Sequence, residues 1–272
     1  MGTKRDSPMM NVLFEWLRKG SKRVKIILGA LLLVFAIVAL KFTIYNPLHF
    51  YIASRVIHFA GIVVLIQKLF SRKTCSGLSV KTQEITALSL LSRLNFRLLM
   101  VGSIYVVLDF ISLVATLLVI WAMRFKLKSS YVKELDTLRR SFVVVPCAIL
   151  AILIHPYTIH SRLNRISWAF GTYLEAISVL PQLHYLQNAK MVETFTGYYV
   201  FALGVSRFFL FAHWLIQSYE NPRLYFLLVE NGNVWLILAL LSELVQTFIL
   251  ADFCYYYMKS FIQGQLLRKM PI

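Results

Sequence analysis

Apolar runs long enough to cross a lipid bilayer constrain this chain more than any other feature. A membrane-spanning helix needs roughly 20 mainly apolar residues, and such runs recur along the 272 residues. The chain is 58% hydrophobic and 15% charged, whereas soluble domains average about 25% charged residues. The sequence therefore predicts an all-α polytopic membrane protein. The predicted spans lie at 26–45, 49–70, 84–101, 103–123, 142–158, 165–186, 198–217 and 234–258.

The net charge of +17 is concentrated in polar segments between and beside these spans. Lys and Arg are frequent in the N-terminal tail, in the connectors 71–83 and 124–141, and in the C-terminal tail. With eight spans, these four segments lie on one side of the membrane, and the positive-inside rule makes that side the cytosol. Both termini are therefore expected in the cytosol. Because the connectors account for the charge, no nucleic acid is predicted as a partner.

The domain organisation follows from the same spans. The predicted parts are a basic tail at 1–25, an extra span at 26–45, a seven-span unit at 49–258 and a second tail at 259–272. The first span also has the look of a signal peptide, since a basic stretch precedes "ILGALLLVFAIVAL". A retained anchor is favoured over it, because the basic stretch is long and only Ala36 and Ala39 offer a small-residue cleavage pattern.

An internal repeat is visible in the layout of the seven-span unit. Residues 58–94 and 172–208 align without a gap, and Arg93 is matched by Arg207. Identities are few, but each copy has an apolar span, a polar connector and a second span that reaches a Ser-Arg pair. Parallel repeats of this kind, joined by a linking helix, are known from transporters. The sequence therefore predicts two three-helix repeats with 142–158 as the linker.

Arg93 and Arg207 lie near the middle of their spans, where an arginine must face protein or a water-filled cavity. One interpretation is an anion-binding cavity, because the planar guanidinium binds a carboxylate through two parallel hydrogen bonds. The other is a structural pairing of both arginines with Glu175 that seals the bundle. The scarcity of acids at this depth favours the cavity. An Arg93 enclosed by a neighbouring acid would rule this cavity out.

Two further residues at similar depth, His58 and Glu175, have two interpretations each. His58 is either a packing residue or a group that titrates between pH 5 and 8 and gates the cavity. Glu175 is either a structural partner of Arg207 or part of the ligand site. Arg97 lies on the same helix face as Arg93 and is expected nearer the non-cytosolic rim, where its side chain can reach water.

Enzyme chemistry has no support in the sequence. Standard motifs for zinc proteases, serine hydrolases, phosphate-binding loops and dinucleotide binding do not occur. Cys75, Cys147 and Cys254 are widely separated and form no metal-binding pair. Neither a catalytic residue nor a metal or other cofactor is therefore predicted.

Several stretches resemble the KDEL receptor family, the receptors that return escaped lumenal proteins to the endoplasmic reticulum. "HFAGIVVLIQKLFSRKTCSGLSVKTQE" resembles the family's first span and connector, while "WAFGTYLEAISVLPQL", "YVFALGVSRFF" and "VQTFILADFCYYY" are similar to later segments. The resemblance covers roughly residues 49–272. Pro181 and Gln182 are also similar to the motif of PQ-loop and SWEET transporters, which share the repeat architecture.

The resemblance implies a seven-helix receptor that binds a C-terminal Lys/His-Asp-Glu-Leu signal more tightly at the acidic pH of the Golgi. It implies that Arg93 holds the terminal carboxylate and that His58 senses pH. It further implies a linked polar pair of Glu175 and Arg207, with Trp214 beside the lysine of the signal. Lumenal proteins become the expected partners, and the membranes of the endoplasmic reticulum and Golgi the expected location.

The end of the chain, "GQLLRKMPI", is similar to the family's cytosolic tail. Arg268 and Lys269 stand where the family has a lysine pair that binds vesicle coat proteins. The resemblance therefore implies coat proteins as partners, besides the membrane lipid that surrounds the spans.

Five positions depart from the family pattern. Tyr51 and Gln217 stand where the family has arginines that meet the acidic side chains of the signal. Phe96 and Arg165 replace acids that receive its Lys or His, and Ser206 replaces a tyrosine. The carboxylate contact survives these changes, so altered peptide specificity is predicted. Two other functions stay open, a PQ-loop-like transporter of small solutes and a trafficking scaffold that binds no ligand.

Overall fold

The computed structural model describes residues 48–98, 104–157, 161–189, 192–220 and 234–262. These residues belong to one unit that begins at Leu48. The predicted tail at 1–25, the extra span at 26–45 and the tail residues Arg268 and Lys269 lie outside the described residues.

Most of the described residues are helical, and the connector between α5 and α6 contains a π-helical turn (Ala122–Lys126) and two 3-10 turns (Lys128–Ser130 and Lys133–Leu135). The helices are α3 (Leu48–Arg72), α4 (Val80–Leu98), α5 (Ile104–Trp121), α6 (Ser141–Leu153), α7 (Arg162–Ile177), α8 (Leu180–Asn188), α9 (Thr194–Glu220) and α11 (Val234–Ile262). Each of the seven spans predicted between 49 and 258 corresponds to a helix, except that the span at 165–186 consists of α7 and α8. This passage breaks before Pro181, which lies in the first turn of α8, where a missing backbone N–H is tolerated. The all-α polytopic fold is confirmed.

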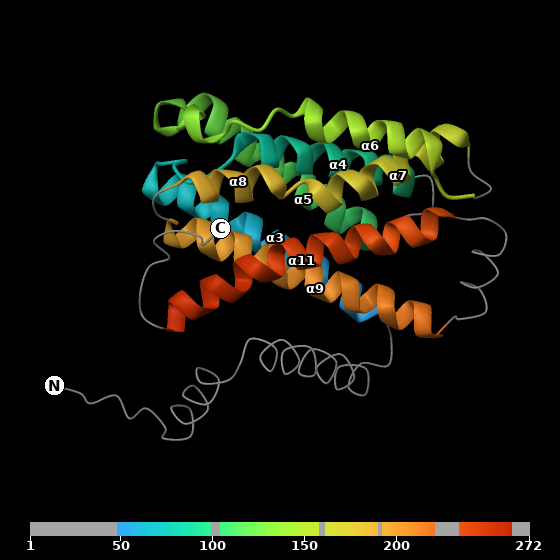
Figure 1. Ribbon diagram of the computed structural model, residues 1–272. Coiled ribbons are helices and arrows are strands. Elements are labelled where there is room, and N and C mark those ends of the chain that lie inside the picture. Colours follow the sequence, from blue (N-terminus) through green and yellow to red (C-terminus); the bar gives the residue numbers. More distant parts are fainter. Residues whose placement is uncertain (1–47, 99–103, 158–160, 190–191, 221–233, 263–272) are drawn as a thin grey trace, which may run out of the picture. The chain divides into compact units, whose positions relative to one another are not determined.

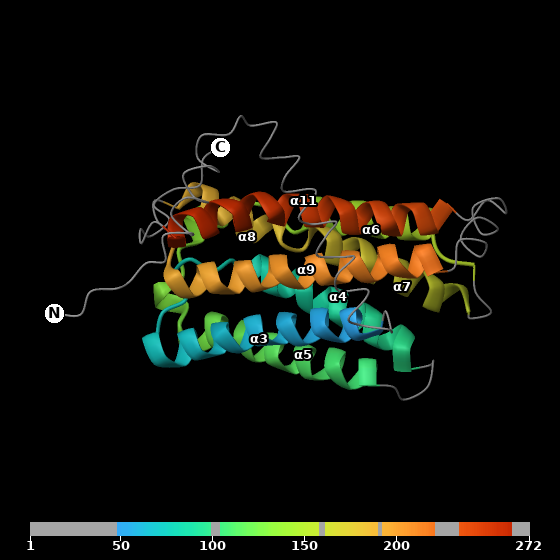
Figure 2. The same ribbon diagram turned by 90° about the horizontal axis from the view of Figure 1, so that it is seen from below.

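The contacts between helices repeat in the two halves of the unit. In the first half α5 packs against both α3 and α4, and in the second half α11 packs against both α7 and α9. Across the halves, α3 packs on α9 and α4 packs on α7. Figures 1 and 2 show these helices side by side, with their ends gathered at two opposite faces. The arrangement is that of two three-helix repeats, and α6, which packs against α7, joins them.

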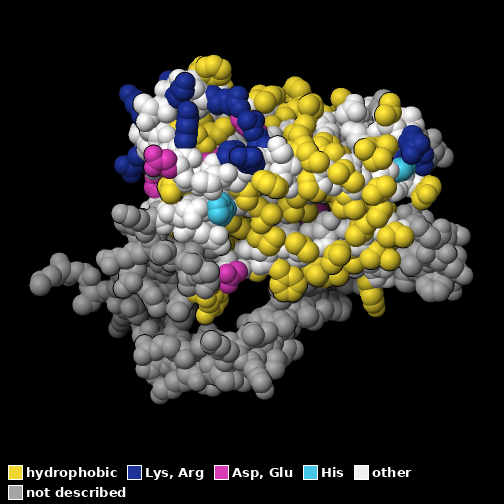
Figure 3. All heavy atoms as spheres, turned by 45° about the horizontal axis from the view of Figure 1, so that its top comes forward, with side chains coloured by type: hydrophobic (Ala, Val, Ile, Leu, Met, Phe, Trp, Pro, Cys, Tyr) yellow, Lys and Arg dark blue, Asp and Glu magenta, His cyan; other side chains and the backbone are white. Residues whose placement is uncertain are grey.

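The distribution of side chains is that of a membrane protein. Large apolar side chains such as Phe110, Val114 and Leu117 of α5 are about half exposed, and Figure 3 shows an apolar band with Lys and Arg gathered at its ends. Four described helices, α3, α5, α9 and α11, are long and apolar enough to cross a bilayer. Helices α4 and α7 are more polar, and they pack against each other. Arg93 of α4 and Glu175 of α7 are buried inside the bundle.

The connector between α3 and α4 is held by residues of the second repeat. The Gln182 side chain donates a hydrogen bond to the Gly77 carbonyl (2.8 Å) and accepts one from the Ser79 N–H (2.9 Å). Lys68, which is fully buried, donates to the Thr196 hydroxyl at 2.9 Å. Gly77 has φ +82°, a conformation that favours glycine. Lys68 and Gln182 occupy matching positions in the repeat alignment, so equivalent residues fasten this end of both halves.

Candidate functional site

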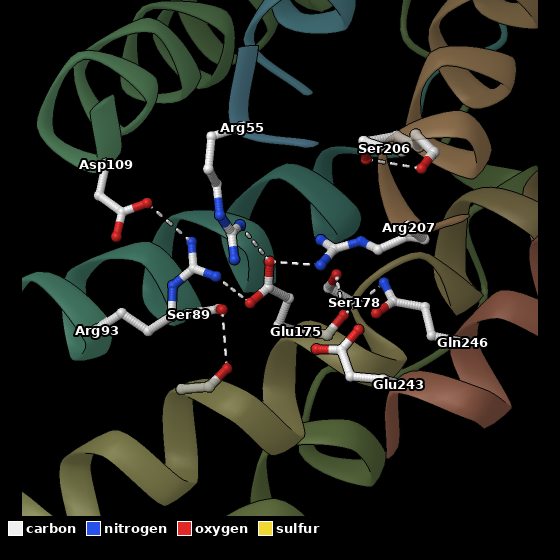
Figure 4. A network of polar contacts seen from close by, with 12 residues as sticks. Arg55, Ser89, Arg93, Asp109, Glu175, Ser178, Ser206, Arg207, Glu243 and Gln246 are labelled. Atoms are coloured by element: carbon white, nitrogen blue, oxygen red, sulfur yellow. Dashed lines mark hydrogen bonds and ion pairs between the residues drawn. The ribbon is translucent and has the colours of Figure 1, made fainter. Parts of the chain in front are cut away.

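Three arginines from three helices converge on one glutamate in the interior of the bundle (Figure 4). Arg55 of α3 and Arg207 of α9 donate to Glu175 Oε1 at 2.8 Å and 2.6 Å, and Arg93 of α4 donates to Glu175 Oε2. The side chains of these arginines are 4–5% exposed and that of Glu175 is 8% exposed. We call these residues the arginine cluster. Its members are charged groups that the fold removes from lipid and water together.

A second acid extends the arginine cluster toward the start of α3. Asp109 of α5 accepts hydrogen bonds from Arg93 Nη2 at 3.2 Å and from Arg97 Nη1 at 2.7 Å. Arg97 also donates to the hydroxyl of Tyr51. The guanidinium carbons of Arg55 and Arg97 lie 4.9 Å and 5.2 Å from the centre of the Tyr51 ring, within the range of cation–π attraction. The ion pairs form a series from Arg97 through Asp109, Arg93 and Glu175 to Arg55. Tyr51 therefore contacts the arginines at both ends of this series.

The close approach of α4 and α7 positions Arg93 against Glu175. The Ser89 hydroxyl, one turn before Arg93, donates to the Gly171 carbonyl at 3.0 Å. A Cβ atom at Gly171 would lie 2.9 Å from Arg93 Cγ, so only glycine leaves room for the arginine stem. From α11, Gln246 donates to the backbone carbonyl of Glu175 at 2.8 Å. This carbonyl lies where α7 ends, and such carbonyls need a partner outside the helix.

The arginine cluster and its neighbours contain more positive than negative charge. Arg55, Arg93, Arg97 and Arg207 face two carboxylates, and a third acid, Glu243 of α11, lies beside them (Figure 4). Within the described part of the chain, the Nε atoms of the three cluster arginines are buried and have no hydrogen-bond partner. Buried polar groups normally find partners. The site therefore has a surplus of positive charge and buried N–H donors without a partner among the described residues.

His58 lies next to the arginine cluster. It is 3% exposed and comes one helical turn after Arg55 on α3. With Arg207, Gln246 and other side chains it lines a small cavity of about 10 Å³, which is about the size that one water needs. The charged groups that act on it electrostatically are Arg207, Arg55, Glu175 and Arg93. His58 thus faces the cluster, although its role in pH sensing stays a prediction.

Trp214 stands apart from the arginine cluster. It follows Arg207 by two helical turns on α9, about 10 Å along the helix axis, and its side chain is half-buried. The neighbouring His213 ring contacts the Tyr51 ring edge-on, with centroids 5.6 Å apart. The structure thus brings together Arg93, Arg207 and Glu175. A ligand would have to extend along α9 to meet Trp214 as well.

Phe96, Ser206 and Arg165, which depart from the family pattern, contact an aromatic ring or their own helix. Phe96 stacks on Trp168, with centroids 4.6 Å apart and an angle of 13° between the rings. The Ser206 hydroxyl donates to the Leu203 carbonyl at 2.8 Å, within its own helix. The Arg165 guanidinium lies 5.8 Å from the centre of the Tyr157 ring. Phe96 is thus part of an aromatic stack and carries no charge.

The structure has the second of the two arrangements considered for the deep arginines. Arg93 and Arg207 both pair with Glu175, and Arg93 is 3% exposed behind Glu175 and Asp109. An enclosed Arg93 counts against a cavity that stands open and empty. The ligand-binding roles of Arg93, Arg207, Glu175 and Trp214 therefore stay predictions, and they require the ion pairs to rearrange.

Two members of this network are missing from the predicted site. Arg55 lies well inside its predicted span, so the criterion of depth that singles out Arg93 would also have found it. Asp109 is visible in the sequence as one of the few deep acids. Its pairing with Arg93 and Arg97 depends on the rotation of α5, which an apolar run does not reveal.

Comparisons with known proteins identify the family. The family model described as "ER lumen protein retaining receptor" matches residues 74–217. An ER lumen protein-retaining receptor of Petunia hybrida is 33% identical over 214 residues, which are 78% of this chain and 94% of the relative. The receptor erd-2.2 of Caenorhabditis elegans is 32% identical over 225 residues, 82% of this chain and 99% of the relative. This chain therefore belongs to the family of ER lumen protein-retaining receptors.

Proposed function

We propose that this protein is a receptor that retains proteins of the endoplasmic reticulum lumen by binding their C-terminal carboxylate at the arginine cluster. The names of its relatives describe this role. The observation that carries the proposal is the surplus of buried guanidinium groups over carboxylates, with Nε donors that are unused among the described residues. A peptide carboxylate supplies the missing negative charge through charge-assisted hydrogen bonds.

The binding step proposed here replaces one internal ion pair by a ligand contact. The side chain of Arg97 is 23% exposed, whereas that of Arg93 is 4% exposed, so a ligand meets Arg97 first. Of the contacts that Arg93 makes with acids, the one to Asp109 is the longer at 3.2 Å. The carboxylate of the ligand takes the place of Asp109, while Glu175 keeps Arg55 and Arg207 in position.

His58 is proposed to make this binding dependent on pH. A protonated His58 adds positive charge beside Arg207 and Arg55, and a bound carboxylate offsets that charge. Proton uptake and ligand binding therefore favour each other, so the affinity rises as the pH falls toward that of the Golgi. Release follows when the receptor returns to the endoplasmic reticulum and His58 loses its proton.

The orientation proposed for the receptor places the connectors 71–83 and 124–141 in the cytosol. The start of α3, with Tyr51 and Arg97 nearby, then faces the lumen, where the ligand is found. Both termini are cytosolic in this orientation, and Arg268 and Lys269 bind vesicle coat proteins. The receptor cycles between the Golgi and endoplasmic reticulum membranes and has no enzymatic role.

The preferred signal is proposed to differ from Lys-Asp-Glu-Leu. Phe96 is stacked on Trp168 and offers no charge to a lysine, and a ligand lysine near Arg165 is repelled. Discrimination by repulsion is a common source of specificity. We expect signals that lack a basic residue at the fourth position from the end.

The test is binding of C-terminal tetrapeptides to the purified protein at acidic pH, with each peptide prepared as free acid and as amide. The free acid binds and the amide does not. Arg93→Lys keeps the charge but loses the planar fork, so affinity falls by about tenfold or more. Arg139→Lys in the exposed connector is the matched control and leaves the affinity unchanged. Equal binding of acids and amides would contradict the proposal.

The repeat architecture favours one alternative function. Two three-helix repeats that pack face to face are also the arrangement of small-solute transporters, and this unit has that contact pattern. Solute flux into proteoliposomes without any bound peptide would support a transporter. A fall in thermal stability for Arg93→Lys, with no ligand found in either assay, would instead support a scaffold with structural arginines.

A further inference from the structure

We propose a second anion site, at the membrane surface on the side of the connectors, that binds an anionic glycerophospholipid of the adjacent leaflet. The site is a groove of about 360 Å³, here called the connector groove. It lies away from the arginine cluster and does not depend on peptide binding. Its lining includes Lys81, Glu84, Arg124, Lys128, Tyr131, Lys133, Asp136 and Arg140.

The charge of the connector groove suits a phosphate. Five of its lining residues are Lys or Arg and two are acids. Arg124 and Arg140 both donate to Glu84, Arg140 at 2.6 Å, yet their side chains stay 48% and 55% exposed. One carboxylate therefore holds two guanidinium groups whose other donors remain accessible. Such an arrangement leaves N–H groups for a phosphate, the anion that arginine forks bind well.

The second acid of the groove is already engaged. Asp136 is buried and accepts hydrogen bonds from the Ser79 hydroxyl at 3.0 Å and from the Tyr131 hydroxyl. Burial and this hydrogen bond raise the pKa of the Tyr131 phenol, so Tyr131 stays neutral and adds no negative charge. Lys128 and Lys133 are exposed at the rim. The positive surplus is thus directed toward solvent and lipid headgroups.

An apolar hollow continues from the connector groove. Its presence favours a lipid over a soluble phosphate as the ligand. Its volume is about 370 Å³, and Ile85 and Leu88 of α4, Ile120 of α5 and Val144 of α6 line it. Glu84, Arg124 and Arg140 also border it, so the two hollows share one rim. An acyl chain fits the apolar part while its phosphate meets the arginines. A free phosphate or a soluble acidic peptide would leave the apolar part without a partner.

The position of the groove along α5 agrees with the level of lipid headgroups. Trp121 ends α5 and is 49% exposed, and exposed tryptophans are enriched at membrane interfaces. The next residues, Ala122–Lys126, form a π-helical turn that contributes Met123 and Arg124 to the groove. Such turns are frequent at functional sites. Figure 3 shows Lys and Arg side chains gathered beside the apolar band at this end. Basic pockets between cytosolic helix ends are known to bind anionic headgroups.

The experiment measures lipid binding to the purified full-length protein by native mass spectrometry and by thermal stabilisation. The probes are dioctanoyl phosphatidylinositol 4-phosphate, dioctanoyl phosphatidylserine and dioctanoyl phosphatidylcholine, with inositol phosphate as the headgroup without chains. We expect both anionic lipids to bind more tightly than phosphatidylcholine, and inositol phosphate to bind weakly. In the double variant Lys128→Ala/Lys133→Ala, affinity for the anionic lipids falls roughly 10- to 30-fold.

The matched control is Lys126→Ala/Arg139→Ala, which removes the same charge from the same connector at exposed positions outside the groove. It keeps the affinity of the parent protein. An equal loss in both double variants would overturn the site, because it would reflect net charge alone. Equal binding of phosphatidylcholine, or of inositol phosphate without chains, would also overturn it. The last two comparisons use the unmodified protein, so they do not depend on the folding of a variant.

Discussion

Substitution of Asp109 tests the proposed binding mechanism most directly. Its carboxylate accepts hydrogen bonds from Arg93 and Arg97 and is 1% exposed. A buried ion pair costs desolvation on both sides, and removal of one partner leaves an uncompensated charge. Asp109 thus acts as an internal anion on the arginines that a ligand carboxylate is proposed to use. In the proposed mechanism, the ligand and Asp109 therefore compete for Arg93 and Arg97.

We therefore predict two opposite effects of Asp109→Asn. Without ligand, the free energy of unfolding falls by roughly 3 kcal/mol, since Arg93 and Arg97 lose a buried partner. With a peptide acid, the affinity rises on the order of tenfold, because no internal carboxylate competes. Thermal unfolding with and without peptide measures both. Asp252→Asn, at an exposed position of α11, is the control that changes neither. A weaker binding of the peptide by Asp109→Asn would refute the competition.

Part of the arginine cluster can be recognised from the sequence alone. Arg93, Arg207 and Glu175 can be picked out because charged groups at mid-span are rare and costly, and the structure joins all three. The pairing of Arg93 and Arg207 with Glu175 is one of the two interpretations that the sequence leaves open, whereas the contacts of Arg93 and Arg97 with Asp109 could not be predicted. An Arg side chain reaches several ångströms in any direction, and its partner depends on helix rotation and on a close contact such as Gly171 with Arg93.

At the scale of elements, the contact of α4 with α7 sets the geometry of the arginine cluster. We predict that Gly171→Ala lowers stability by roughly 1–3 kcal/mol, since its Cβ would lie 2.9 Å from Arg93 Cγ and 3.2 Å from the Ser89 carbonyl. Peptide affinity falls too, because Arg93 shifts from Glu175. Thr172→Ala, the next residue and less buried, changes either quantity little. Thermal unfolding and peptide binding are the measurements, and an unchanged affinity would separate Gly171 from the site.

The contact of α8 with the connector after α3 offers a second prediction for an element. Gln182→Leu leaves the Gly77 carbonyl and the Ser79 N–H buried without their partner. Each such group costs about 1–3 kcal/mol, so we expect a loss of roughly 2–6 kcal/mol and faster amide exchange at residues 75–79. Gln187→Leu, at an exposed position on the same helix, is the matched control. Unchanged exchange in the connector would mean that other contacts hold it.

The order of the seven described passages could be predicted, but two features of the elements could not. Apolar length alone indicates the spans, because a bilayer demands it. The division of one span into α7 and α8 depends on Pro181, and a proline in an apolar run is compatible with a kink, a break or a new first turn. Helices α4 and α7 are less apolar than other spans because each contributes charge to the centre. Only the packing of the seven passages shows that these charges meet.

At the scale of the whole molecule, side-chain hydrogen bonds join the two repeats at the end of the unit that carries the connectors, and charged groups lie in its interior. Lys68 and Gln182, which are equivalent in the two repeats, hold the connectors on the side of the connector groove. The arginine cluster lies inside, with Arg97 partly exposed. In the proposed mechanism, the ligand arrives from the opposite side, and the ion pairs rearrange while the contacts of Lys68 and Gln182 stay in place. Because the exterior is apolar and the charged groups lie inside, such a rearrangement exchanges the acids that pair with the buried arginines and leaves the lipid-facing surface unchanged.

The pH response belongs to the molecule as a whole, since it decides where a ligand is bound and where it is released. We predict that a peptide acid binds about tenfold more tightly at about pH 5.5 than at about pH 7.5, because a charged His58 adds to the positive surplus that the carboxylate offsets. In His58→Asn the affinity no longer depends on pH over this range. His184→Asn is the matched control, because His184 contacts Thr137 and Asn188 at the connector end, and it keeps the pH response.

Calorimetry in two buffers of different ionisation enthalpy counts the protons taken up on binding. If the affinity of His58→Asn still depends on pH, the titrating group is another residue. If proton uptake is lost in His58→Asn and kept in His184→Asn, ligand binding is coupled to protonation of His58 beside the arginine cluster.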